Sequence, residues 1–152
     1  MFPSSRRFPH FAREALAGAL PGAGISYVHL KDLGGRRKAR PASPGESSSN
    51  SGWRVGGFRG YADYMQTEPF EAALEELMRL GRAAPTAIMC AEALWWRCHR
   101  RLIADALTVR GGQVMHLGLR PQPVEHELTP FAVVGADGGL TYPSTQARLE
   151  LS

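Results

Sequence analysis

Apolar side chains recur at helical spacing in three segments of the chain. The clearest is residues 70–80, where apolar positions 70, 74, 77, 78 and 80 face glutamates and an arginine on the other side. This pattern predicts an amphipathic helix with one buried face, ending near Gly81. Helices are also predicted over residues 11–20 and 96–109, and Gly111 and Gly112 end the second of these.

Strands are predicted where β-branched, aromatic and other apolar residues gather between turn residues. They cover residues 25–30, 86–90 and 113–117, while residues 131–134 and 140–142 predict a C-terminal β-hairpin. Residues 86–90 are apolar without alternation, which is typical of a strand buried on both faces of a parallel sheet. Because a helix separates them from residues 113–117, we expect a parallel βαβ unit with a right-handed crossover.

The length predicts a single α/β domain over residues 1–152. Glycine, proline, serine and arginine dominate residues 31–57, and residues 47–52 are too polar and flexible to pack. Loops of this length inside a compact domain are usually mobile linkers or lids over a site. We therefore expect residues 31–57 to form a flexible loop or lid.

Arginine gives the chain a formal net charge of +4 and a pI near 9.5. Many of the arginines lie in a few stretches: Arg36, Arg37, Arg40, Arg54, Arg59, Arg97, Arg100 and Arg101. This clustering favours an anionic partner, either a small molecule or a nucleic acid, although solvated arginine faces are the plain alternative.

The chain contains two cysteines, Cys90 and Cys98, and no apolar run near the roughly 20 residues that cross a bilayer. Its start lacks the apolar core of a signal peptide. Two closely spaced cysteines do not suggest a secreted disulfide scaffold. We therefore expect reduced thiols, a cytoplasmic protein and no membrane partner.

Candidate chemistry gathers at the predicted carboxyl edge of the sheet, where open α/β sheets bind ligands. Cys90 and Glu92 end a predicted strand, and Arg97 to Arg101 open the next helix. The helix start and its arginines would hold a phosphate or carboxylate and lower the pKa of a nearby thiol. The catalytic candidates are Cys90, Glu92, Cys98 and His99, and the anion-binding candidates at this edge are Arg97 and Arg100.

Other interpretations of these residues remain open. Cys90, Glu92, Cys98 and His99 offer four metal-ligand types, but their spacing fits no common zinc pattern, so no metal site is assigned. His99 and Glu92 would equally suit a helix cap and a buried hydrogen bond, and each cysteine would suit a small core position. The sequence points to no particular cofactor.

A second cluster interleaves aromatic residues with arginines between positions 53 and 64. The rings of Trp53, Phe58, Tyr61 and Tyr64 would form a lid or stack on a nucleotide or a single-stranded nucleic acid, and Arg54 and Arg59 would bind its phosphates. The same rings would also serve to lock the lid onto the domain.

Four elements, in this order, carry a family resemblance: residues 33–35, residues 58–65, Cys90-Ala91-Glu92 followed by Cys98-His99-Arg100, and residues 128–131. With them the chain resembles the domain of unknown function 488 family over nearly its whole length. The resemblance implies a Rossmann-like three-layer α/β sandwich with a mainly parallel sheet. It implies no established activity.

The chain departs from the family pattern at its start. Family members usually begin with a strand carrying Thr-x-Gly-His or Thr-x-Gly-Tyr, then a helix, then a strand ending Asp-Val-Arg, before the stretch that here is Pro3-Ser4-Ser5. We therefore expect the first βαβ unit of the family to be lacking. Its loss would expose a sheet edge, which favours marginal stability or oligomers.

Two functions follow from these features. The first is an enzyme acting on an anionic nucleotide or phosphorylated substrate, with Cys98 or Cys90 as nucleophile and Glu92 or His99 as proton carrier. The second is a non-catalytic module that binds nucleotides or nucleic acid through the basic and aromatic segment.

Overall fold

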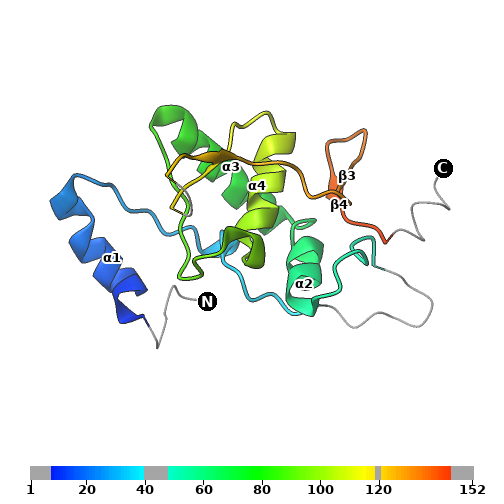
Figure 1. Cartoon of the computed structure of the whole chain (residues 1–152), viewed down its shortest axis with the longest axis horizontal. Coiled ribbons are helices and arrows are strands. Elements are labelled where there is room, and N and C mark those ends of the chain that lie inside the picture. The colour runs from blue at the N-terminus through cyan, green and yellow to red at the C-terminus, as the bar shows by residue number, and fades with distance from the viewer. Residues whose placement is uncertain (1–7, 40–47, 119–120, 145–152) are drawn as a thin grey trace.

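The computed structural model describes residues 8–39, 48–118 and 121–144 (Figure 1). Its helices are α1 (Arg13–Ala19), α2 (Gly56–Tyr64), α3 (Glu68–Ala83) and α4 (Arg100–Val109). Short 3-10 turns are η1 (Pro9–Phe11), η2 (Pro21–Ala23), η3 (Lys31–Leu33) and η4 (Trp95–Arg97). Helices α2, α3 and α4 lie together, whereas α1 stands apart from them and buries none of its residues (Figure 1).

The longest helix, α3, has the amphipathic pattern expected from its sequence. Pro69 lies in its first turn, where no backbone N–H is needed, and Glu68 and Glu71 suit the positive end of the helix dipole. Phe70, Leu74 and Leu77 form its buried face. The predicted helix over residues 70–80 is therefore present and extends a few residues further at each end.

The core joins the buried faces of α2, α3 and α4 with residues from the C-terminal hairpin. Tyr61, Phe70, Leu74, Leu102 and Tyr142 are almost completely buried in it. The Tyr61 hydroxyl donates a 2.7 Å hydrogen bond to the backbone oxygen of Leu33, which satisfies the polar end of that ring. This core fixes the N-terminal end of α4, which carries Cys98 and His99 immediately before it.

The strands form two small antiparallel sheets. Strand β1 (Met115–His116) pairs with β2 (Val124–Glu125), and β3 (Val133–Val134) pairs with β4 (Leu140–Thr141) as a C-terminal hairpin. The described part of the chain contains no parallel sheet. The prediction of a Rossmann-like three-layer sandwich with a mainly parallel sheet is therefore wrong.

The reason lies in strand pairing. Residues 25–30 and 86–90 have strand-like composition, but they run as irregular chain, with no ladder to any other described segment. Ile25 and Val28 are each 52% exposed, whereas a central parallel strand would bury both faces. Of predicted strand 113–117, only β1 forms, and it pairs antiparallel with β2, so no parallel crossover follows α4.

The segment predicted as a loop or lid contributes to the core where the structure describes it. Leu33, Asn50 and Trp53 are buried, and α2 already begins at Gly56. The Gly52 backbone N–H donates a 2.8 Å hydrogen bond to the Tyr142 oxygen, which ties this segment to the C-terminal hairpin. Residues 40–47 of the predicted loop, like Pro3-Ser4-Ser5, lie outside the described residues.

None of the helices in the described ranges is long and apolar enough to span a bilayer. This finding agrees with the absence of a long apolar run in the sequence.

Candidate functional site

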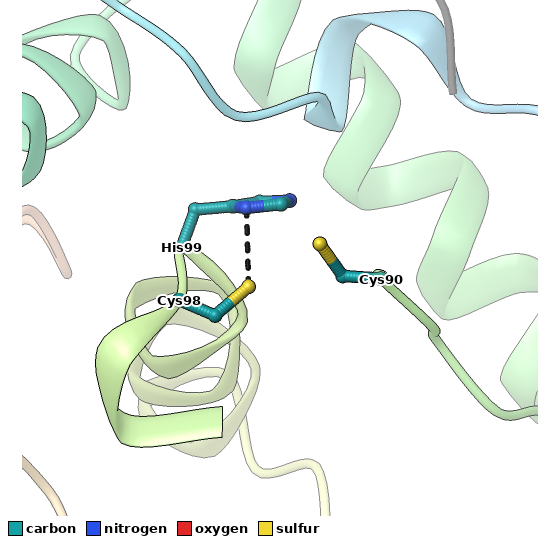
Figure 2. A group of neighbouring side chains, drawn as sticks. All are labelled: Cys90, Cys98 and His99. Carbon is teal, nitrogen blue, oxygen red and sulfur yellow. Dashed lines mark hydrogen bonds between the residues drawn. The ribbon is translucent and has the colours of Figure 1, made fainter. Parts of the chain in front are cut away.

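Three of the predicted site residues converge at the N-terminal end of α4. Cys90 reaches this point from irregular segment 85–90, while Cys98 and His99 come directly before the helix, and Figure 2 shows their side chains directed toward one another. Their potential ligand atoms all lie within 4.8 Å of one another. Cys98 Sγ lies 3.3 Å from His99 Nδ1. We call these three residues the thiol site.

The intervening turn brings the two cysteines together. Turn η4 lies between the two cysteines and ends at Cys98, whose backbone N–H donates a 3.1 Å hydrogen bond to the Trp95 oxygen. The Arg100 guanidinium reaches back and donates hydrogen bonds to the backbone oxygens of Glu92 and Ala93. Arg100 thus closes the turn and places its charge beside the thiols.

The Cys98 thiol is the more acidic of the pair. Its pKa is lowered to about 6, first because the neighbouring Cys90 thiol stabilises the Cys98 thiolate. Burial opposes the shift, but the backbone N–H and the guanidinium of Arg100 add to it. The pKa of Cys90 is raised, because the neighbouring Cys98 disfavours a second ionised thiol and because Cys90 is buried. The site therefore favours one thiolate beside one thiol.

The imidazole of His99 is fixed in place by its neighbours. Its ring centroid lies 5.3 Å from that of Tyr61, and a Cβ at Gly35 would lie only 2.6 Å from its Nδ1 atom. Only glycine therefore fits at position 35 without displacing the ring. Burial lowers the pKa of His99, so the ring is neutral at neutral pH, and in its Nδ1–H form it donates to the Cys98 thiolate.

Arg100 and Arg37 flank the thiol site. In the sequence, Arg37 stood out only as one of the clustered arginines. Arg100 and Arg37 both lower the pKa of His99 through their charges. The Arg37 guanidinium lies over the Tyr64 ring, 3.6 Å from its centroid. The Nε atoms of both arginines are buried and have no hydrogen-bond partner among the described residues. Such unpaired donors are suited to an anion oxygen.

A comparison with protein-family models places these residues in a known family. The model of the domain of unknown function DUF488 matches residues 1–107, which include Cys90, Cys98, His99 and Arg100. The chain belongs to the DUF488 family. This confirms the resemblance drawn from the sequence. No curated protein and no solved structure matches the chain.

The side chains of the other predicted catalytic and anion-binding residues of this DUF488 protein are exposed or half-buried. Glu92 is exposed, and its carboxylate accepts a 3.2 Å hydrogen bond from the Leu94 backbone N–H. Arg97 and Arg54 are exposed, and Arg59 is half-buried on α2. Of the predicted set, the structure thus brings Cys90, Cys98, His99 and Arg100 together.

The four rings proposed as a lid or stacking surface pack inside the molecule. Trp53 is buried and stacks on Phe58 with ring centroids 4.8 Å apart. Tyr61 is buried against His99, and the half-buried Tyr64 carries Arg37 on its face. Of these four rings, Tyr61 is therefore the one in contact with the thiol site.

Two thiols and an imidazole also form a ligand set of the kind that binds zinc. The surrounding charges oppose this use in the DUF488 chain. Arg100 and Arg37 already place positive charge at the site, and Cys90 holds its proton firmly. A divalent cation would have to overcome both. The positive charge at the thiol site therefore favours an anion over a divalent cation.

A cavity of about 390 Å³ lies elsewhere. Its walls come from the α2–α3 junction, the C-terminal end of α4 and the β3–β4 hairpin, and Arg110 and Glu71, paired at 2.5 Å, contribute to its lining. Neither cysteine nor His99 lines it. The cavity is therefore separate from the chemistry of the thiol site.

The sequence analysis missed a second polar cluster in this DUF488 protein. It consists of Asp105 on α4 together with His126, His116 and Tyr142, linked in sequence-distant hydrogen bonds. One signal was available: Asp105 stands in the middle of five consecutive buried residues of α4, 102–106. A carboxylate at such a position requires hydrogen-bond donors from elsewhere.

Proposed function

We propose that the protein is a thiol-dependent enzyme that acts on an anionic substrate, with Cys98 as its nucleophile. The observation that carries this proposal is the convergence of Cys90 and His99 on the Cys98 thiol, with ligand atoms within 4.8 Å of one another. Together with Arg100, this environment lowers the pKa of Cys98 to about 6. At pH 7 about nine-tenths of such a thiol is ionised, against about three-hundredths of an ordinary thiol with a pKa of about 8.5. Thiolate is the reactive form of cysteine.

The charges around Cys98 favour a substrate that carries a phosphate or a carboxylate. Arg100 and Arg37 each have a buried Nε donor without a partner among the described residues. An unpaired buried donor costs about 1–3 kcal/mol, and an anion oxygen in hydrogen-bond contact would offset that cost. Guanidinium groups also bind phosphate and carboxylate in a directional, two-pronged manner.

For a phosphorylated substrate the reaction has two steps. The Cys98 thiolate attacks phosphorus, an S–P bond forms and the P–O bond to the leaving alcohol breaks, so that the alcohol oxygen carries away the electron pair. Water then attacks phosphorus, loses a proton and releases phosphate with the free thiolate. Cys90 stabilises the Cys98 thiolate before the attack and again when it leaves phosphorus. A cytoplasmic location, where thiols remain reduced, suits this chemistry.

The alternative of a non-catalytic nucleotide or nucleic-acid binding module has less support. Its stacking surface would need exposed rings. Trp53 is 6% exposed and packs against Phe58, Phe131 and Tyr142. The net charge of +4 supports both functions equally.

The test is the pH dependence of alkylation at each cysteine, measured with iodoacetamide and mass spectrometry of the folded protein. We expect Cys98 to react with a midpoint near pH 6 and Cys90 to stay unreactive. Cys90→Ala should move the Cys98 midpoint up toward the ordinary thiol value of about 8.5. Alkylation of the unfolded protein in urea controls for access of the reagent. A Cys98 midpoint near 8.5 in the wild type would reject the proposal.

A further inference from the structure

The second polar cluster centres on a carboxylate that is completely buried. Asp105 is 0% exposed, and its Oδ1 atom accepts hydrogen bonds from the Thr129 backbone N–H at 2.9 Å and from His126 Nε2 at 2.8 Å. Its Oδ2 atom accepts a 2.8 Å hydrogen bond from the Tyr142 hydroxyl. Three donors on one carboxylate stabilise its ionised form.

This carboxylate determines where the protons lie on two histidines. Because Asp105 accepts, His126 carries its proton on Nε2, and a neutral His126 then has a bare Nδ1. That bare atom lies 2.9 Å from His116 Nε2, which must therefore be the donor in this contact. A neutral His116 is left with its lone pair on Nδ1. The chain of hydrogen bonds thus ends in one proton acceptor.

The orientation of His116 is fixed on both sides. Strands β1 and β2 place it beside His126, whose backbone N–H donates a 2.9 Å hydrogen bond to the Val114 oxygen. The Trp95 ring stacks on the imidazole with centroids 3.5 Å apart and planes within 4°. An imidazole held this way keeps one tautomer and one direction.

The same short turn connects His116 with the thiol site. Trp95 belongs to η4, which separates Cys90 from Cys98. The charge of Arg100 acts on both Cys98 and His116. Neither Glu92, which is exposed, nor His99, which is engaged with Cys98, remains as a suitable base for water.

We propose that His116 Nδ1 is the proton acceptor for the water that releases the substrate from Cys98, with Asp105 and His126 as its positioning residues. This inference rests on the function proposed above. Water attacks phosphorus, its proton passes to His116 Nδ1, the S–P bond breaks and Cys98 leaves as thiolate. The Nε2 proton of His116 moves toward His126, so positive charge spreads toward the Asp105 carboxylate. Solvent then takes the proton from His116.

The groups that face His116 suit this role. Burial and the charge of Arg100 lower the pKa of His116 to about 4, so the ring is neutral and able to accept a proton at neutral pH. Asp105 is the one acidic partner of the network, and it acts through His126. Tyr142 stays protonated, because burial and Asp105 raise its pKa.

The proton positions can be tested on the wild-type protein without any assay of activity. Long-range ¹H–¹⁵N spectra of the histidine side chains report which ring nitrogen carries the proton. We expect His116 and His126 each to be a single tautomer protonated at Nε2, with exposed His10 as the solvent-averaged reference. A His116 protonated at Nδ1, or an average of tautomers like His10, would overturn the inference.

The role in the reaction is tested by burst kinetics with p-nitrophenyl phosphate. Wild type should release one p-nitrophenolate per Cys98 rapidly and then turn over steadily. His116→Gln should keep the burst but slow the steady rate by at least about 100-fold, the usual effect of a general base. His29→Gln, a half-buried histidine outside the network, is the matched control.

The outcomes separate the two proposals. A normal burst and an unchanged steady rate in His116→Gln would overturn the role of His116 and leave the thiol nucleophile standing. No burst in the wild type, or turnover that survives Cys98→Ser, would overturn the proposed function and the role of His116 with it. Circular dichroism of each variant shows whether the fold is retained.

Discussion

Replacing Asp105 by alanine is the substitution for which the structure predicts the largest single effect. The change removes an acceptor that three donors share: His126 Nε2, the Tyr142 hydroxyl and the Thr129 backbone N–H. The side chain of His126 is 1% exposed and Tyr142 is 0% exposed. Water therefore cannot reach these donors without a rearrangement of the core.

The expected loss of stability follows from the cost of the donors left behind. An unsatisfied buried donor costs about 1–3 kcal/mol, so three of them predict roughly 3–6 kcal/mol after partial relaxation. A domain of this size typically has about 5–15 kcal/mol in total. Tyr142→Phe is the matched comparison, because it removes only one of the donors and should cost about 1 kcal/mol.

Urea unfolding followed by tryptophan fluorescence measures both variants, since Trp53 is buried in the core beside Tyr142. If the free energy of unfolding of Asp105→Ala lies within about 1 kcal/mol of the wild-type value, the three donors have found other partners and the predicted cost is wrong. An Asp105→Ala loss equal to that of Tyr142→Phe would refute it as well, because the three hydrogen bonds would then not be separate contributions.

The same network makes stability depend on pH. Burial alone would raise the pKa of Asp105, but its hydrogen bonds from His126, Thr129 and Tyr142 lower it overall. A carboxyl group with a lowered pKa stabilises the folded state above its unfolded value of about 4. That stability is lost as the pH falls through the lower folded value. Wild type should therefore lose stability below about pH 4, and Asp105→Ala should not show this loss.

Three further predictions concern Gly35, His116 and the exposed residues Ile25 and Val28. Gly35→Ala should displace His99 and weaken its hydrogen bond to the Cys98 thiolate, which would raise the alkylation midpoint of Cys98; an unchanged midpoint contradicts the packing. Because the pKa of His116 falls from 6.5 to about 4 on folding, the unfolded chain binds more protons than the folded protein between pH 4 and pH 6.5. Urea titrations should show wild type losing stability from pH 6.5 to 4, and His116→Gln losing less. Finally, Ile25→Ser with Val28→Thr should raise the monomer share in sedimentation, because it removes two half-exposed apolar side chains that favour association; an unchanged share contradicts this.

Helices could be predicted from the sequence because their pattern is local. The apolar positions of α3 repeat every three or four residues, and the same residues, Phe70, Leu74 and Leu77, are buried. Strands require a partner that can lie anywhere in the chain. Residues 25–30 and 86–90 have the composition of strands, but composition says nothing about whether a neighbouring ladder exists. This is why the predicted parallel sheet is wrong while the helices are present.

The thiol site was visible in the sequence for a similar reason. Cys90, Cys98 and His99 lie within ten residues, so one turn and one helix start suffice to bring them together. Arg37 and His116 reach the region from distant segments, and nothing in their local sequence marks them. The rings of Trp53 and Phe58 show the opposite difficulty. Stacking surfaces and core packing use the same residue types, and only the burial of these rings distinguishes the two.

A single helix sets the geometry of both polar clusters. The N-terminal end of α4 holds Cys98, His99 and Arg100, while Asp105 lies about one and a half turns further along. Arg101 and Asp105 lie four residues apart and therefore on the same face of the helix. Both bind Thr129. Arg101 donates a 3.0 Å hydrogen bond to the Thr129 hydroxyl, and the Asp105 carboxylate accepts one from the Thr129 backbone N–H. That face therefore fixes segment 126–129 and with it His126. Since the helix is rigid on this scale, the thiol site and Asp105 cannot shift independently of each other, as the proposed two-step transfer would require.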